Sequence, residues 1–238
     1  MADLDQSAVL RVAALIPAAG SGQRMGGGIP KPYQVLQGRE ILARTLDVFE
    51  ACAIIHEVWL VVAADLHEFC RQRIVEPYGF RKVQGLVVGG SARQESVWRG
   101  LQHVAQTVDV VVIHDGVRPF VTASLLQHTV DSAVQHGAAT AAVPLHDTLK
   151  RVSASGLVEA TIPRDHLWRT QTPQAFRLPL LLKAFEHAWQ MGLQATDEAG
   201  LVEALGHPVY VVPGTERNVK ITTPDDLNIC EGFLHHPM

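Results

Sequence analysis

The chain has 238 residues, of which 47% are hydrophobic and 18% charged, so it is long enough for one large domain and too apolar to be disordered. Its formal net charge of -4 gives no sign of a nucleic-acid surface, so we expect no nucleic-acid partner and only local clusters of basic residues. Cys52, Cys70 and Cys230 are widely spaced, which fits reduced thiols and not a disulfide framework.

The first predicted element is a buried strand at residues 12–16, which leads into a glycine-rich loop. The loop reads PAAGSGQRMGGGIPKPY and contains two cations, Arg24 and Lys31. Composition alone favours a flexible surface loop with two solvated charges. The glycines, prolines and spaced cations directly after a buried strand favour a phosphate site, because glycines let main-chain N–H groups approach a ligand closely.

Spacing excludes two common phosphate loops. The dinucleotide-binding pattern G-x-G-x-x-G fails at Met25, and Asp65, the nearest acidic residue that ends a strand-like run, comes too late. A Walker loop needs Ser or Thr after Gly-Lys, whereas Lys31 follows Pro30. An NAD-dependent oxidoreductase is therefore the weakest interpretation.

Strands and helices alternate through the next hundred residues or so, which predicts an α/β fold. We expect a Rossmann-like, mostly parallel sheet with helices on both faces. Ligands of such sheets bind beyond the carboxyl ends of the strands, where the loops after Ile16, Val88 and Ile113 should meet. The predicted strands cover residues 57–63, 83–88, 108–113 and 138–143, and the predicted helices begin at Ile41 and cover about 66–75, 94–105 and 124–136.

Two of these loops carry candidate binding residues. Gly89 and Gly90 allow a close approach, and Ser96 offers a hydroxyl that can read the edge of a base, although an ordinary strand-to-helix turn explains them equally well. Asp115 ends the next strand, with Arg118 close behind. An acid there suits Mg²⁺, ribose or substrate hydroxyls, and its alternative is a turn-initiating Asp.

The pattern changes after Pro144. Residues 148–152 and 157–162, separated by Ser-Ala-Ser-Gly, predict a β-hairpin added to the parallel sheet. A lone hairpin is marginally stable in water, so it needs a partner, which is either its own domain or a second subunit. We assign residues 1–238 to a single domain in which residues 148–163 form a protruding β-arm.

The C-terminal part continues the α/β pattern. We expect a helix at residues 178–191, an N-cap at Thr196 followed by acids in a first turn, a strand at 209–212, a short strand at 218–221 and a last helix opened by Pro224. Lys220 lies on that short strand and taken alone reads as a solvated charge.

Targeting and metal signals are missing from the sequence. No apolar run is long enough to span a bilayer, and residues 1–11 lack the basic start and apolar core of a signal peptide, so we expect a cytoplasmic protein without a membrane partner. The twelve histidines form no H-E-x-x-H motif and the cysteines no Cys-x-x-Cys motif, so we predict no metal ligand among the side chains.

Four segments carry a resemblance to a known family: PAAGSGQRM with PKPY, HDGVRPF, QTPQAF and NVKITTPDDL. The first resembles the loop of nucleotidylyltransferases that join an NTP to a phosphorylated alcohol. All four, in this order, resemble the 2-C-methyl-D-erythritol 4-phosphate cytidylyltransferases of non-mevalonate isoprenoid biosynthesis. The resemblance implies CTP and a phosphorylated polyol as substrates, Mg²⁺ carried mainly by the CTP phosphates, and a homodimer formed through the β-arm.

The resemblance also implies roles for residues of this chain. Arg24 and Lys31 are the expected transition-state stabilisers. The cytosine and ribose residues are Ala18, Ala19, Gly20, Gly90 and Ser96. The acceptor residues are Asp115, Arg118, Lys220 and Thr172, the last in a turn at residues 171–174, with Thr148 and Arg164 reaching in from the neighbouring subunit. Many members have Asp at the position of Ser91, which puts a side-chain contact with the base there in doubt.

The implied chemistry explains why cations dominate this set. A phosphate monoester is already largely ionised near neutral pH, so the attacking group needs no protein base. The difficulty lies in bringing two polyanions together and stabilising the charge that develops at phosphorus. Two alternatives stay open: a cytidylyltransferase for another phosphoalcohol, such as ribitol 5-phosphate, and a non-catalytic nucleotide-binding homologue on the same fold.

Overall fold

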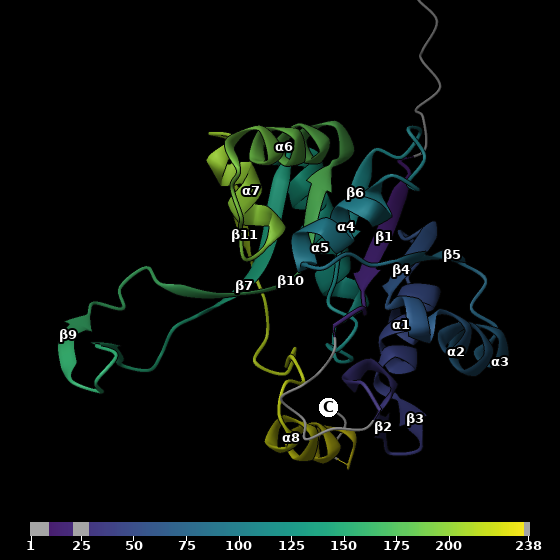
Figure 1. The fold of residues 1–238 in the computed structure, drawn as a ribbon, viewed down its shortest axis with the longest axis horizontal. Coiled ribbons are helices and arrows are strands. Elements are labelled where there is room, and N and C mark those ends of the chain that lie inside the picture. Colours follow the sequence, from purple (N-terminus) through teal and green to yellow (C-terminus); the bar gives the residue numbers. More distant parts are fainter. Residues whose placement is uncertain (1–9, 21–28, 236–238) are drawn as a thin grey trace, which may run out of the picture.

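The computed structural model describes residues 10–20 and 29–235, and its centre is a seven-stranded sheet (Figure 1). The strand order is β11-β7-β10-β6-β1-β4-β5. All neighbouring pairs are parallel except those of β10, which is antiparallel to both β6 and β7. The strands are β1 (Val12–Pro17), β4 (Glu57–Val62), β5 (Val83–Val88), β6 (Val110–Ile113), β7 (Ala138–Pro144), β10 (Trp168–Arg177) and β11 (Tyr210–Pro213).

Both faces of the sheet are buried, as the alternation along β1 shows. Val12, Ala14 and Ile16 belong to one apolar cluster, whereas Ala13 and Leu15 belong to another, and all five are fully buried. A strand buried on both faces reads as a continuous apolar run because successive side chains point to opposite sides. The first cluster packs against α1 (Ile41–Ala51) and α5 (Ala123–His136), and the second against α4 (Arg93–Leu101), α6 (Leu178–Met191) and α7 (Glu198–Ala204). The predicted α/β fold with a mostly parallel sheet and helices on both faces is confirmed.

The helical segment between β4 and β5 is less regular than the sequence predicted. It consists of a 3-10 turn at Ala64–Leu66, α2 (His67–Cys70), a π-helical turn at Arg71–Val75 and α3 (Glu76–Tyr78). The segment ends at Gly79, whose φ of 66° lies in the left-handed region that glycine adopts without a steric penalty.

The predicted turn at residues 171–174 is wrong in its main feature, because these residues belong to the long strand β10. The sequence did not predict this strand because of Pro173. Proline has no N–H to donate to a neighbouring strand, so it is rare in the middle of a sheet. The pairing of β10 with β7 shifts register between Thr170 and Gln174, and this irregularity accommodates the proline.

The predicted short strand at residues 218–221 is also wrong, because this segment has no regular secondary structure. Its main chain is held by isolated bonds instead of a ladder: the Ile221 N–H donates to the Val117 carbonyl, and the Asn218 carbonyl accepts from Arg118. The segment leads into α8 (Pro224–His235), which begins at the predicted proline. Ile221 and Cys230 form a small apolar cluster with Leu36 and Ile41.

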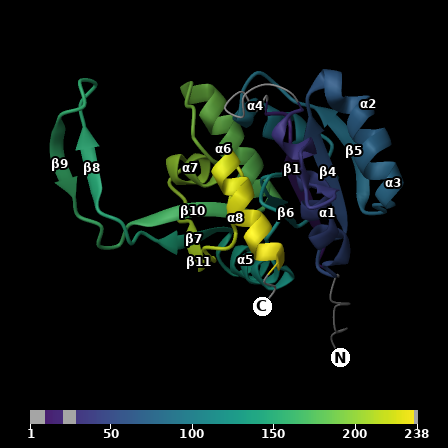
Figure 2. The ribbon, with the colours of Figure 1, turned by 90° about the horizontal axis from the view of Figure 1, so that it is seen from below.

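The predicted hairpin is present and projects from the body of the molecule (Figure 2). β8 (Leu149–Val152) pairs with β9 (Val158–Ile162) in a sheet of its own, so the hairpin does not extend the central sheet. Val152, Leu157 and Val158 are each at least half exposed. Our division of the chain into one domain with an arm at residues 148–163 stays an interpretation. A second small pair is formed by β2 (Val35–Leu36) and β3 (Arg39–Glu40).

The structure also bears on the cysteines and on membrane-spanning helices. Cys52, Cys70 and Cys230 are all buried free thiols. Within residues 10–20 and 29–235, no helix combines the length and the apolar composition needed to cross a bilayer.

Candidate active site

A cavity of about 690 Å³ lies at the carboxyl ends of β1, β5 and β6. The chain runs from β1 through β4 to β5 on one side and then returns to β6 on the other side of β1, so the strand order reverses there. Ligands of open α/β sheets bind in the crevice that such a reversal leaves. The described residues that line the cavity are Pro17, Ala18, Ala19, Gly20, Lys31, Pro32, Gly90, Ser91, Ala92, Arg93, Ser96, Asp115, Val117, Lys220, Ile221 and Thr222. The predicted meeting of the loops after β1, β5 and β6 is confirmed.

The turn after β5 packs closely against the loop after β1. A Cβ on Gly89 would lie 2.7 Å from the Cβ of Ala19 and 3.0 Å from Ser96 Oγ, so only glycine lets the two segments approach this closely. The Ser96 hydroxyl accepts from the Gly90 N–H at 3.0 Å and donates to the Ala92 carbonyl at 2.9 Å. Ser96 therefore holds the turn in shape and retains acceptor capacity towards the cavity.

Main-chain bonds decide which groups the base side of the cavity can offer. The Ala18 N–H donates to the Val61 carbonyl at 2.7 Å, and the Gly90 N–H is taken up by Ser96. Of these two residues, Ala18 therefore offers its carbonyl group to a ligand and not its N–H. The predicted base and ribose residues Ala18, Ala19, Gly20, Gly90 and Ser96 all line the cavity, and their contacts with a nucleotide stay a prediction.

Ser91 is engaged within its own turn. Its N–H and its hydroxyl both donate to Glu95 Oε2, at 2.7 and 2.8 Å. Arg99 holds the other oxygen of Glu95 and also donates to the Gly89 carbonyl at 2.8 Å. Glu95 thus places a carboxylate beside residue 91 from the first turn of α4.

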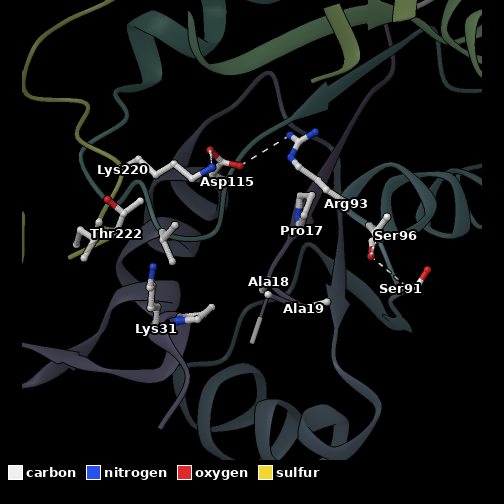
Figure 3. A pocket seen from close by; sticks show the side chains of 16 residues that line it. Pro17, Ala18, Ala19, Lys31, Ser91, Arg93, Ser96, Asp115, Lys220 and Thr222 are labelled. Carbon is white, nitrogen blue, oxygen red and sulfur yellow. Dashed lines mark hydrogen bonds and ion pairs between the residues drawn. The ribbon is translucent and has the colours of Figure 1, made fainter. Parts of the chain in front are cut away.

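The acceptor side of the cavity is organised around Asp115. Its Oδ2 lies 3.0 Å from Lys220 Nζ and its Oδ1 lies 3.8 Å from Arg93 NH2 (Figure 3). Oδ2 also lies 3.2 Å from Arg118 Nε. Three cations from three different segments therefore surround one buried carboxylate. Burial acts to raise the pKa of Asp115, but the charges of Lys220, Arg93 and Arg118 outweigh it and hold this pKa well below its usual value. Asp115 is therefore ionised at neutral pH.

Arg118 and Thr172 stand behind Asp115 and are not among the described residues that line the cavity. Arg118 is 9% exposed, and its NH1 donates to the Asn218 carbonyl at 2.7 Å. The Thr172 hydroxyl accepts from the Asp115 N–H at 3.0 Å, and its carbonyl accepts from Asn218 Nδ2 at 2.7 Å. Both residues support Asp115, and direct contact with the substrate stays a prediction for them.

Lys31 enters the cavity from a one-turn 3-10 helix, Lys31–Tyr33. It is 8% exposed, and in Figure 3 its side chain points towards the pair formed by Asp115 and Lys220. Arg24, the other predicted catalytic cation, lies outside the described residues. Even so, the described lining contains three cations, Lys31, Arg93 and Lys220, against one carboxylate, which suits phosphorylated substrates.

Thr148 and Arg164 lie at the base of the arm, in the connections between β7, β8, β9 and β10. Both are exposed, neither is among the described cavity residues, and Arg164 donates to the His146 carbonyl. The structure of one chain therefore does not bring them to the site, in keeping with the prediction that they act on a neighbouring subunit, which stays untested.

His114 precedes Asp115 but is not placed as a general base. It is fully buried, and its Nε2 lies 3.2 Å from the Arg118 carbonyl, which makes Nε2 the protonated nitrogen. Burial lowers the pKa of His114 to about 4. The ring is therefore neutral and inside the protein, where it supports the loop that carries Asp115.

The sequence did not single out Arg93 and Thr222, which both line the cavity. Arg93 closes the Gly-Gly-Ser-Ala-Arg turn, and Thr222 follows Lys220 closely, so proximity to predicted residues was the available signal. The predicted N-cap before α7 is present but lies one residue later, because Asp197 and not Thr196 caps the helix and accepts from the Gly200 N–H at 3.0 Å.

The chain is similar over nearly its whole length to proteins of one family. The family model described as 2-C-methyl-D-erythritol 4-phosphate cytidylyltransferase matches residues 12–236. A protein of that name from Geotalea uraniireducens is 46% identical over 227 residues, which cover 94% of this chain and 97% of that protein. Another, from Geobacter metallireducens, is 47% identical and covers 94% of this chain and 98% of its own length.

Solved structures with similar names share the fold. The 4-diphosphocytidyl-2C-methyl-D-erythritol synthase of Anaerococcus prevotii superposes with a TM-score of 0.83 at 31% identity, covering 95% of this chain and 97% of that one. The 2-C-methyl-D-erythritol 4-phosphate cytidylyltransferase of Thermus thermophilus superposes with a TM-score of 0.78 at 34% identity, covering 95% and 100%.

Proposed function

Because the chain belongs to the 2-C-methyl-D-erythritol 4-phosphate cytidylyltransferase family, we propose that the cavity at the end of β1 binds both of its substrates. The enzyme transfers the cytidylyl group of CTP to 2-C-methyl-D-erythritol 4-phosphate, giving 4-diphosphocytidyl-2-C-methyl-D-erythritol and pyrophosphate, in isoprenoid biosynthesis. One observation supports the shared cavity above all: Lys31, residues 90–92, Asp115 and Lys220 come from distant parts of the sequence and line one space.

In the proposed mechanism the two sides of the cavity hold the two substrates. The 89–92 turn and the 17–20 segment hold cytidine, and Asp115 with Lys220 holds the acceptor. An oxygen of the acceptor phosphate attacks the α-phosphorus of CTP, the bond from that phosphorus to the bridging oxygen breaks, and pyrophosphate leaves with the electron pair. Lys31 stabilises the negative charge that develops during this exchange, and we expect the same role for Arg24.

We propose Mg²⁺ as the cofactor, carried mainly by the nucleotide. The described residues contain no group of three His, Cys, Asp or Glu side chains that could hold a metal ion. Asp115 is the carboxylate of the described lining, and cations already surround it. This donor set fits an ion that takes most of its ligands from phosphate oxygens and water, as Mg²⁺ commonly does. When bound, it would neutralise charge on the triphosphate.

We also propose that the chain acts as a homodimer in the cytoplasm. The arm exposes Val152, Leu157 and Val158 and pairs only within its own hairpin, which is marginally stable without a partner. A second copy that embraces the arm would cover these side chains and bring Thr148 and Arg164 to the neighbouring cavity. The three buried free thiols fit a reducing compartment.

The test is an assay of pyrophosphate release with a panel of NTPs and phosphoalcohols. Turnover should be fastest with CTP and 2-C-methyl-D-erythritol 4-phosphate, should stop in excess EDTA and should return with Mg²⁺. Faster turnover with ribitol 5-phosphate would show that the acceptor is a different phosphoalcohol. Binding of CTP without turnover across the panel would favour a non-catalytic homologue. Unchanged turnover in EDTA would contradict the proposed requirement for Mg²⁺.

A further inference from the structure

Glu198 is a buried carboxylate that the mechanism above does not use. It is 1% exposed, begins α7 and forms an ion pair with Arg93, the first residue of α4. Its Oε2 has no hydrogen-bond partner among the described residues. A carboxylate that is fully buried with only one oxygen satisfied is costly to the fold, so its presence calls for a role beyond packing.

Two buried glutamines fix the position of Glu198. Gln174, on β10, donates to Asp197 Oδ2 at 2.8 Å and accepts from the Ala199 N–H at 3.1 Å, so it clamps the residues on either side. Gln94, next to Arg93 on α4, accepts from the Ala195 N–H at 3.1 Å and donates to the Leu193 carbonyl at 3.2 Å. The start of α7 is therefore attached both to the central sheet and to α4.

Arg93 connects Glu198 to Asp115, which lines the cavity. NH1 of its guanidinium pairs with Glu198, and NH2 lies 3.8 Å from Asp115 Oδ1. The two nitrogens of the planar fork thus face different carboxylates, one outside the cavity and one lining it. Lys220 and Arg118 hold Asp115 by the other oxygen, Oδ2, so Arg93 is the described cation directed at Oδ1.

We propose that Glu198 is a positioning residue for acceptor binding: it holds Arg93 so that Arg93 orients the Oδ1 side of Asp115 towards the phosphorylated polyol. The inference rests on the proposed function of this cavity. A carboxylate whose two oxygens are both oriented by fixed cations accepts hydrogen bonds from polyol hydroxyls in one geometry, whereas a carboxylate held by one oxygen alone rotates. The cytidine side of the cavity does not depend on the contacts of Arg93 with Glu198 and Asp115, because Ser96 and Glu95 hold the 89–92 turn.

The first test is the Glu198→Gln variant, which keeps the shape of the side chain and removes its charge. We expect the KM for 2-C-methyl-D-erythritol 4-phosphate to rise roughly three- to thirtyfold, the range usual for residues that act through others, while the KM for CTP stays within about twofold. The rise in melting temperature caused by the acceptor alone should shrink, and the rise caused by CTP alone should persist. Glu203→Gln, the same change at an exposed position of α7, should leave all four quantities unchanged.

A second variant covers the case in which Glu198→Gln does not fold because the partly buried Arg93 loses the closer of its two carboxylate partners. Replacing both residues, in Arg93→Met with Glu198→Met, removes the pair together, and such replacements of buried ion pairs are often neutral for stability. The folded double variant should show the same selective loss of acceptor affinity. An acceptor KM within twofold of wild type, an equal rise for both substrates, or a double variant that also fails to fold would overturn the proposal. If the unmodified enzyme itself fails to use CTP and this acceptor, the proposed function is at fault instead.

Discussion

Among single residues, Lys31 illustrates how the fold makes a mobile side chain into a fixed charge. Its short 3-10 turn is closed by the Gln34 N–H, which donates to the Lys31 carbonyl at 3.1 Å. Tyr33 is 2% exposed and packs edge-on against Phe69, with ring centroids 5.3 Å apart. The backbone that follows Lys31 is therefore anchored, and the buried ammonium is in place before the substrates arrive, which is what electrostatic catalysis requires.

We predict that Lys31→Ala lowers kcat by about a hundred- to a thousandfold, because one preorganised donor to the transition state is lost. The KM for CTP should change only a few fold, since other groups bind the nucleotide in the ground state. Steady-state kinetics with both substrates varied will measure this, with Lys183→Ala, an exposed change on α6, as the matched control. A normal kcat in the Lys31 variant would remove it from the mechanism.

Among the elements, the hairpin of β8 and β9 is the one whose stability a single chain does not explain. Its side chains are largely exposed on both strands, and the strands pair with each other and not with the central sheet. A hairpin without a core of its own gains its stability from whatever it packs against. Because Thr148 and Arg164 flank it, the same contact that stabilises the arm would complete the acceptor site of a second copy.

We predict that two inactive variants restore activity when they form mixed dimers. In a dimer of one Lys31→Ala chain and one Arg164→Ala chain, one of the two sites contains both defects and the other contains none. Purified mixed dimers should therefore have about half of the wild-type activity, as expected for a two-fold symmetric dimer that shares its sites. Pairing Lys31→Ala with Lys220→Ala is the control: both residues line the cavity of their own chain, so each of the two sites carries one defect and the mixed dimer should stay inactive. No recovery in verified mixed dimers would contradict the shared site.

For the whole molecule, the loop after β6 couples the site to the stability of the fold. His114 is buried within it, packs against Phe49 with ring centroids 5.3 Å apart and donates to the Arg118 carbonyl. Because burial lowers the pKa of His114 to about 4, the unfolded chain binds a proton there at a pH at which the folded chain does not. The stability that this neutral ring contributes is present above about pH 6.5 and is lost as the pH falls towards 4. The depressed pKa of Asp115 acts in the same direction at lower pH.

We predict that His114→Gln flattens the dependence of stability on pH. The amide nitrogen can still donate to the Arg118 carbonyl, but the side chain no longer titrates. Between pH 7.5 and pH 5 the free energy of unfolding of the wild type should fall by about 2 kcal/mol more than that of the variant. Urea unfolding at several pH values will measure this difference, in which the other histidines cancel. Parallel curves for the two proteins would show that His114 is not the titrating group.

The amino-acid sequence alone determined the α/β fold, the buried strands and the edge of the sheet at which the ligand loops meet, because apolar periodicity and glycine spacing are local patterns. The family motifs added the substrates and most of the lining residues. Only the tertiary structure decided that residues 171–174 lie in a strand, that residues 218–221 do not, and that Arg118 and Thr172 stand behind Asp115. It also brought Glu198 to Arg93, two residues far apart in the chain. These outcomes depend on hydrogen bonds and ion pairs between distant segments, and no local pattern in the sequence encodes which of them will meet.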